Sequence, residues 1–144
     1  MATYKIGELA DRSGCLVETV RYYERIGLLP EPVRTANNYR AYNDEHADRL
    51  QFIRHCRALD MSIDEIRQLV EIRSRPESLC TGVNELLDRH IGHITERIEA
   101  LRALEVQLRH LRSCCDSVST SGDCGILQAL DELESDHTVA IPRH

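Results

Sequence analysis

The feature that most constrains the fold is a long run of apolar residues at helical spacing between Val83 and Arg112. Successive apolar positions lie four and three residues apart in alternation. One additional step of three residues, from Leu101 to Leu104, interrupts the alternation before it continues. The apolar positions are Leu87, Ile91, Ile94, Ile98, Leu101, Leu104, Leu108 and Leu111. This spacing predicts a helix with one apolar stripe that packs in a coiled coil. Its partner is an intrachain helix or a second copy of the chain. A second copy is favoured, because no other expected helix approaches this length and symmetric dimers are the commonest assembly.

The first thirty residues predict two short helices. Apolar residues recur at helical spacing in KIGELADRSG, Gly14 interrupts the pattern, and VETVRYYERIG resumes it. Two short helices joined by a tight glycine turn form a helix-turn-helix. The next segment, LLPEPVRTANNYRAYN, carries two prolines and the turn pair Asn37-Asn38. It predicts a small hairpin, or wing.

Two further helices are expected before the long one. Asn43 is placed to cap a helix that runs to about Leu59, with Leu50, Ile53 and Leu59 on its buried face. The sequence Ser62-x-x-Glu65 is a capping box that begins the next helix. Arg75-Pro76 ends this compact part of the chain.

The charge and composition of the chain limit the kinds of partner that it is expected to bind. The net charge is −6, yet residues 1–76 hold twelve basic and twelve acidic side chains, so the excess of acid lies in the second half. Seventeen of the eighteen basic residues are arginine, whose planar fork suits phosphate and guanine. No apolar run approaches the roughly 20 residues that cross a bilayer, and the first residues lack the pattern of a signal peptide. We therefore expect a cytoplasmic protein without membrane partners, in which six cysteines stay reduced.

The cysteines near the long helix suggest a metal site. Cys80 precedes that helix and Cys115 follows it, so about 45 to 50 Å separates them within one chain. In an antiparallel pair, Cys80 of one subunit would lie beside Cys115 and Cys124 of the other. Three thiolates favour soft ions such as Pb(II), Cd(II) or Hg(II). Zn(II) is possible if water, Asp116 or Asp123 completes a tetrahedron.

The other three cysteines are less clear candidates. Cys114 could ligate only with backbone distortion or a second ion. Cys15 and Cys56 are expected in the apolar core, where cysteine behaves as a small hydrophobe. The expected organisation is mainly α: a winged helix-turn-helix over 1–76, a linker and antiparallel coiled-coil helix over 77–113, a metal-binding loop with a short helix over 114–133, and a disordered tail over 134–144.

The sequence resembles the MerR family of transcriptional regulators along nearly its whole length. The segments IGELA, TVRYYERIGLLP, NNYRAY and LQFIRHCRALDMSIDEIRQLV follow the family pattern in order. Cys80, Cys115 and Cys124, spaced 35 and then 9 residues apart, and the closing CGIL resemble the lead- and cadmium-responsive (CadR/PbrR-like) subgroup.

The resemblance implies a homodimer that binds promoter DNA, represses without metal and activates with it. The metal-bound form is expected to distort the DNA so that RNA polymerase engages both promoter elements of a metal-efflux gene. By position, the resemblance assigns DNA contacts to the recognition helix (Thr19, Arg21, Tyr23), the wing (Arg34, Tyr39, Arg40) and the helix that follows (Arg57). Arg21 is the best candidate to approach a base edge.

Two departures from the family pattern matter. Leu16 stands where many members place a capping serine, so the recognition helix is expected to begin with a weaker cap. Cys114-Cys115 also resembles zinc-responsive relatives, but their histidine four residues further on is Ser119 here. The absence of this histidine disfavours a site with two zinc ions. A Zn(II)- or Hg(II)-responsive regulator is the alternative interpretation.

Other classes of function fit less well. A redox or iron–sulfur sensor of this family would cluster four cysteines in a short segment, which Cys115 and Cys124 do not provide. A metal buffer would not need the helix-turn-helix. The sequence has no phosphate loop, catalytic triad or metal-hydrolase motif, so we expect no enzymatic activity.

Overall fold

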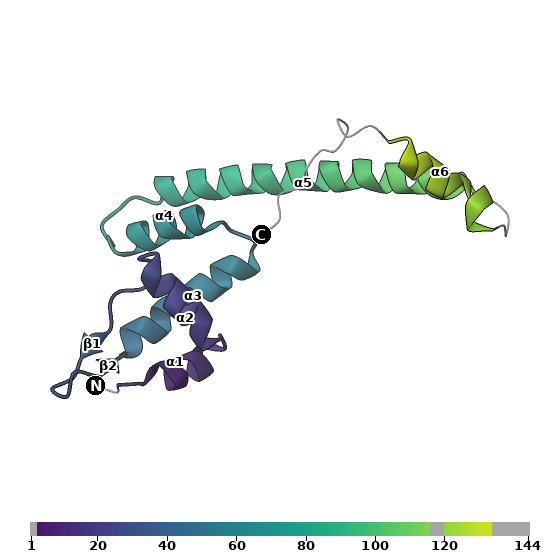
Figure 1. The fold of residues 1–144 in the computed structure, drawn as a ribbon. Helices are drawn as coiled ribbons and strands as arrows, with labels where there is room; N and C mark the ends of the chain where they lie inside the picture. Colours follow the sequence, from purple (N-terminus) through teal and green to yellow (C-terminus); the bar gives the residue numbers. More distant parts are fainter. Residues whose placement is uncertain (1–2, 116–119, 134–144) are drawn as a thin grey trace. The chain divides into compact units, whose positions relative to one another are not determined.

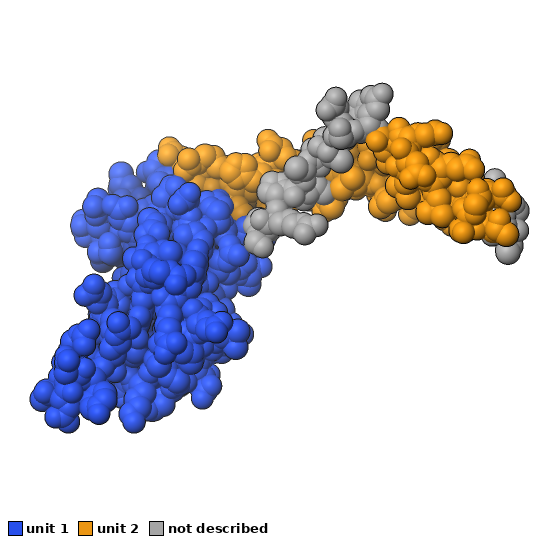
Figure 2. All heavy atoms as spheres, viewed as in Figure 1, with its two compact units in different colours: residues 1–83 blue, residues 84–144 orange. Residues whose placement is uncertain are grey.

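The computed structural model describes residues 3–115 and 120–133. The chain divides into two compact units, residues 1–83 and residues 84–144 (Figure 2). The elements are α1 (Ile6–Ser13), α2 (Val17–Arg25), β1 (Val33–Arg34), β2 (Arg40–Ala41), α3 (Asp44–Ala58), α4 (Ile63–Arg73), α5 (Thr81–Ser113), η1 (Ser121–Asp123) and α6 (Gly125–Asp131), and Figure 1 labels the α-helices and the strands. The expected fold class is confirmed: the chain is mainly helical, with a helix-turn-helix and a long helix after it. The predicted disordered tail, 134–144, lies outside the described residues, as do Asp116 and Ser119.

The turn of the helix-turn-helix depends on Gly14. This residue has a φ of 68° and ends α1 in the left-handed conformation, which glycine adopts without steric cost. A Cβ at this position would collide with the guanidinium of Arg54. The same guanidinium donates a hydrogen bond to the Ser13 carbonyl at 3.1 Å. Gly14 thus both makes the turn and lets α3 approach it.

The wing is a two-stranded antiparallel hairpin. Val33 pairs with Ala41 and Arg34 with Arg40, and the turn between them places Asn38 at a φ of 64°. Two backbone hydrogen bonds then join Tyr42 to Tyr4, at 2.7 and 2.9 Å. The base of the wing is therefore tied to the beginning of the chain.

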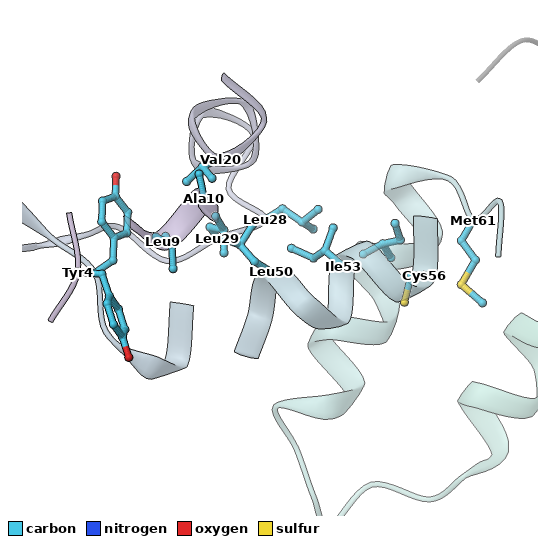
Figure 3. Packing of buried hydrophobic residues seen from close by; sticks show 12 residues of the cluster. Tyr4, Leu9, Ala10, Val20, Leu28, Leu29, Leu50, Ile53, Cys56 and Met61 are labelled. Carbon is cyan, nitrogen blue, oxygen red and sulfur yellow. The ribbon is translucent and has the colours of Figure 1, made fainter. Parts of the chain in front are cut away.

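One apolar core holds the first unit together. Twelve buried residues from α1, α2, α3, α4 and the segments that precede and connect them form it: Tyr4, Leu9, Ala10, Val20, Leu28, Leu29, Tyr42, Leu50, Ile53, Cys56, Met61 and Ile66. Figure 3 shows how side chains from these separate helices meet. The expectation for Leu59 was wrong. Its side chain is 63% exposed, because α3 has ended there and the left-handed Asp60 turns the backbone away.

Both predicted caps are present. The Asn43 side chain accepts from the His46 backbone N–H, and the Asn43 N–H donates to the His46 ring nitrogen Nδ1, at 3.2 and 3.1 Å. Ser62 and Glu65 make the reciprocal pair of a capping box that begins α4. Each arrangement satisfies backbone donors that the first turn of a helix leaves without partners.

The second unit is dominated by α5, which has 33 residues and is about 50 Å long. Five of the eight predicted stripe residues along it are exposed in the single chain, and Ile94, Leu104 and Leu111 are partly buried. Leu87, Ile91, Ile98, Leu101 and Leu108 are between 37% and 63% exposed. Among the described helices, none is long and apolar enough to cross a membrane.

Candidate metal and nucleic-acid sites

The end of α5 and the beginning of α6 carry three of the six cysteines. Cys114 and Cys115 directly follow the last residue of α5, and their backbone N–H groups donate to the carbonyls of Leu111 and Arg112. The Arg112 guanidinium also donates to the Cys115 carbonyl at 2.7 Å. Cys115 is therefore held against the last turn of the long helix.

Gly125 closes the loop that leads from Cys115 to Cys124. A Cβ on Gly125 would collide with the carbonyl oxygen of Cys114, so the two backbone segments touch at this point. Only a residue without a side chain permits this approach. This role of Gly125 was not predicted from the sequence, although its place directly after Cys124 was a signal for it.

The Cys115 side chain also interacts with the Cys124 thiol. The backbone N–H of Leu127 lowers the pKa of the Cys124 thiol, the N–H of Ile126 and the Cys115 side chain act in the same direction, and desolvation opposes them. A lowered pKa increases the thiolate fraction near neutral pH. Since thiolate sulfur is the species that binds metals, this pair suits a thiophilic cation.

Cys80 and Cys114 are not part of this pair. Cys80 is exposed and immediately precedes α5, so the 33 residues of that helix separate it from Cys115. Cys114 is exposed, and its thiol donates to the His110 carbonyl at 3.6 Å. Within one chain, the structure brings together two of the three predicted sulfur ligands and leaves the third at the other end of α5.

Cys15 and Cys56 lie in the first unit, as expected for core residues. Cys56 is buried, and Cys15 is half-buried against the same apolar cluster. Burial raises the pKa of both thiols, so both favour the protonated, less reactive form.

The first unit also carries a basic cleft of about 370 Å³ between α2 and the wing. Four arginines and two glutamates line it together with one proline: Arg21, Arg25, Arg34, Arg40, Glu24, Glu31 and Pro32. Four positive charges against two negative ones leave an excess of two, which suits an anionic polymer backbone. Arg25 was missed by the sequence analysis, although it follows Arg21 at the i+4 spacing that places two residues on one helix face.

The wing residues predicted to contact DNA lie on the surface. Tyr39 is 72% exposed. The Arg34 guanidinium donates to the Asn38 side chain at 3.2 Å, and Arg40 lies 3.6 Å from a Glu24 carboxylate oxygen. Most guanidinium N–H donors of Arg34 and Arg40 therefore remain available for contacts with DNA.

The remaining predicted DNA-binding residues divide between surface and core. Arg21 is exposed on α2 and Thr19 is half-buried there. Tyr23 packs against the core, and burial raises the pKa of its hydroxyl. The Arg57 guanidinium donates to the Met61 carbonyl at 2.7 Å. Tyr23 and Arg57 therefore have structural contacts of their own.

Comparison with known proteins places the whole arrangement in a family. Residues 4–71 match the family model described as MerR HTH family regulatory protein, and residues 47–111 match the model MerR, DNA binding. The chain is 46% identical, over 75% of its length and 80% of the relative's, to the HTH-type transcriptional regulator ZntR homolog of Haemophilus influenzae. It is 38% identical to the mercuric resistance operon regulatory protein of Bacillus cereus, over 88% of this chain and 96% of that one.

A solved structure gives a closer match. The transcription regulator PbrR691 from Ralstonia metallidurans CH34, in complex with lead(II), is 54% identical. The alignment covers 88% of this chain and 98% of that one, with a TM-score of 0.79. These proteins are regulators of transcription and not enzymes. The chain belongs to the MerR family and is a DNA-binding, metal-responsive transcriptional regulator.

Proposed function

We propose that this regulator responds to Pb(II) or Cd(II), bound by the thiolates of Cys115 and Cys124 and by Cys80 of the partner subunit. The observation that carries the proposal is the paired thiols of Cys115 and Cys124, with backbone N–H groups lowering the pKa of one of them. A site of two sulfurs is incomplete for most soft ions, and a third thiolate makes a set that lead and cadmium favour. The 54% identity to a regulator solved with lead(II) supports the same choice.

The partner subunit is proposed because of α5. A helix of 33 residues whose apolar stripe is mostly exposed gains stability by covering that stripe. We propose an antiparallel homodimer, since antiparallel pairing is the arrangement that brings the Cys80 end of one α5 to the Cys115 end of the other. Such a dimer has two equivalent sites, and a soft cation bound in either one would cross-link the two subunits.

DNA binding is assigned to the basic cleft and the wing. We propose that Arg21, Arg34, Tyr39 and Arg40 hold the phosphates of a promoter, with Arg21 nearest to a base edge. Thr19, Tyr23 and Arg57 are proposed to contribute from α2 and α3, the last two chiefly by shaping the surface. The protein is proposed to act in the cytoplasm, where RNA polymerase uses the distorted promoter and transcribes metal-efflux genes.

Metal binding can drive this change only through a difference in affinity between the repressing and activating forms. A preference of roughly 100-fold supplies about 2.7 kcal/mol per site, and two sites supply about twice that. Distortion of promoter DNA costs on the order of 1 to 6 kcal/mol. Two sites of this preference supply about 5.4 kcal/mol, which covers most of that range.

The alternative is a Zn(II) or Hg(II) sensor, which the similarity to ZntR and to the mercuric resistance regulator supports. In vitro transcription from the regulated promoter, with each metal added separately at a concentration that saturates the protein, distinguishes the two. We expect Pb(II) and Cd(II) to give higher transcription than Zn(II) or Hg(II), and Cys124→Ser to abolish activation. Higher transcription with Zn(II) or Hg(II) would select the alternative.

A further inference from the structure

Glu24 has an unusual position for an acidic residue on the recognition helix. Its side chain is only 13% exposed, and it lines the cleft whose other charged residues are mostly arginines. A carboxylate in that place repels the phosphates that the cleft is suited to bind. Its contacts indicate what offsets this repulsion.

The Glu24 carboxylate connects α2 to the wing at two points. One oxygen accepts a hydrogen bond from the Tyr42 hydroxyl, directly after β2. The other oxygen lies 3.6 Å from the guanidinium of Arg40, within β2. The wing consists of two strands of two residues each, so these contacts add to the Tyr42–Tyr4 backbone hydrogen bonds that hold its base.

The inner contact is a stable anchor. The Tyr42 side chain is fully buried, and burial together with the Glu24 hydrogen bond raises the pKa of its hydroxyl to about 12. Tyr42 therefore keeps its proton and remains a donor at physiological pH. One carboxylate oxygen is held by this donor, so the other points at Arg40.

The outer contact leaves Arg40 available. The Arg40 side chain is 55% exposed, and its separation from Glu24 is longer than that of a good charge-assisted hydrogen bond. A guanidinium has five N–H donors, so Arg40 can face Glu24 with one edge and a phosphate with another. The carboxylate thus reduces the freedom of a long side chain before DNA arrives.

We propose that Glu24 is a positioning residue for DNA binding: anchored by Tyr42, it fixes Arg40 and the wing relative to the recognition helix. The inference rests on the proposed DNA contact of Arg40. The proposal predicts weaker DNA binding when Glu24 loses its charge. Electrostatics alone predicts the opposite, because removal of a negative charge from a DNA-binding cleft is expected to tighten binding.

The test is a double-mutant cycle of Glu24→Gln and Arg40→Ala, measured as affinity of metal-free protein for the promoter fragment. Glutamine keeps the shape and an oxygen that accepts from Tyr42 but loses the charge that faces Arg40. We expect Glu24→Gln to weaken binding about fivefold to tenfold in the parent and to have little effect once Arg40 is alanine. We also expect the slope of log affinity against log salt to fall by about one phosphate contact in Glu24→Gln.

Glu18→Gln is the matched control, because Glu18 is an exposed acid on the same helix. This control should leave binding unchanged or tighten it slightly. Tighter or unchanged binding by Glu24→Gln, or additive effects in the cycle, would overturn the proposal. If Glu24→Gln loses its helical circular dichroism, Arg40→Gln on the exposed wing takes its place, and unchanged affinity for that variant overturns the proposal as well.

A parent protein that binds the promoter but ignores lead and cadmium would contradict the proposed metal response. It would not affect the cycle, which is measured without metal.

Discussion

The two units of this chain differ in how they complete their apolar surfaces. In residues 1–83 the side chains of Val20, Ile53 and Ile66 have no exposure, and four helices share one core. In α5 the stripe residues Ile91 and Leu101 are 61% and 52% exposed. The first unit contains the residues that its fold requires, whereas the second presents a surface that a partner must cover.

The largest expected effect comes from the closed core. Ile53→Ala removes a fully buried side chain from α3, and we expect it to lower the free energy of unfolding of the first unit by about 2 to 5 kcal/mol. Chemical denaturation followed by circular dichroism measures this loss. It should be independent of protein concentration, and a concentration-dependent loss would show that the core is not self-sufficient.

The same kind of truncation on α5 should act differently. Ile98→Ala is expected to raise the dissociation constant of the dimer about tenfold to a hundredfold, because it removes apolar surface from the proposed interface. Sedimentation equilibrium measures the change. Thr95, also on α5, is exposed and donates to the Ile91 carbonyl, so Thr95→Ala is the control that should change dimerisation little. A parent protein that remains monomeric at micromolar concentration would remove the contrast between the units.

The loop that follows α5 provides the next test. Gly125→Ala forces a methyl group onto the Cys114 carbonyl and should separate the two thiols, which we expect to weaken lead or cadmium binding about tenfold or more. The matched control is Gly122→Ala, because a Cβ at Gly122 has nothing within 4 Å. Competitive titration followed by the ultraviolet thiolate-to-metal band measures both variants. Equal affinity for the two alanine variants would mean that the close approach of Gly125 does not shape the site.

The smallest expected effect concerns the recognition helix. Leu16 is 71% exposed and gives α2 no side-chain cap, as the sequence predicted. Leu16→Ser should add a cap and raise the free energy of unfolding of the first unit by about 0.5 to 1 kcal/mol. Ser62→Ala, which removes an existing cap from α4, should lower it by a similar amount. Thermal unfolding of both variants checks the pair, and a destabilising Leu16→Ser would contradict the first expectation.

Features set by neighbouring residues could be predicted from the sequence. Gly14, Asn43 and Ser62 each act on the backbone within a few positions, and all three have the structural role that their local pattern indicated. The long helix was predicted from its apolar spacing to within two residues at either end.

Features that depend on distant parts of the chain were missed or mistaken. Periodicity placed Leu59 inside, but it does not show where a helix ends and the backbone turns. The contacts of Glu24 with Arg40 and Tyr42 join residues 16 and 18 positions apart, so no spacing rule identifies them. The close approach of Gly125 to Cys114 likewise joins residues 11 positions apart.

The central claim is that each metal site draws sulfur from both subunits, and a mixed dimer tests it most directly. One subunit carries Cys80→Ser, the other carries Cys115→Ser with Cys124→Ser, and two affinity tags isolate the mixed species. We predict one lead or cadmium ion per dimer bound with the parent affinity, because one site keeps all three thiolates and the other loses all three. The absence of any site with the parent affinity would contradict the account, since it would mean that each site is built within a single chain.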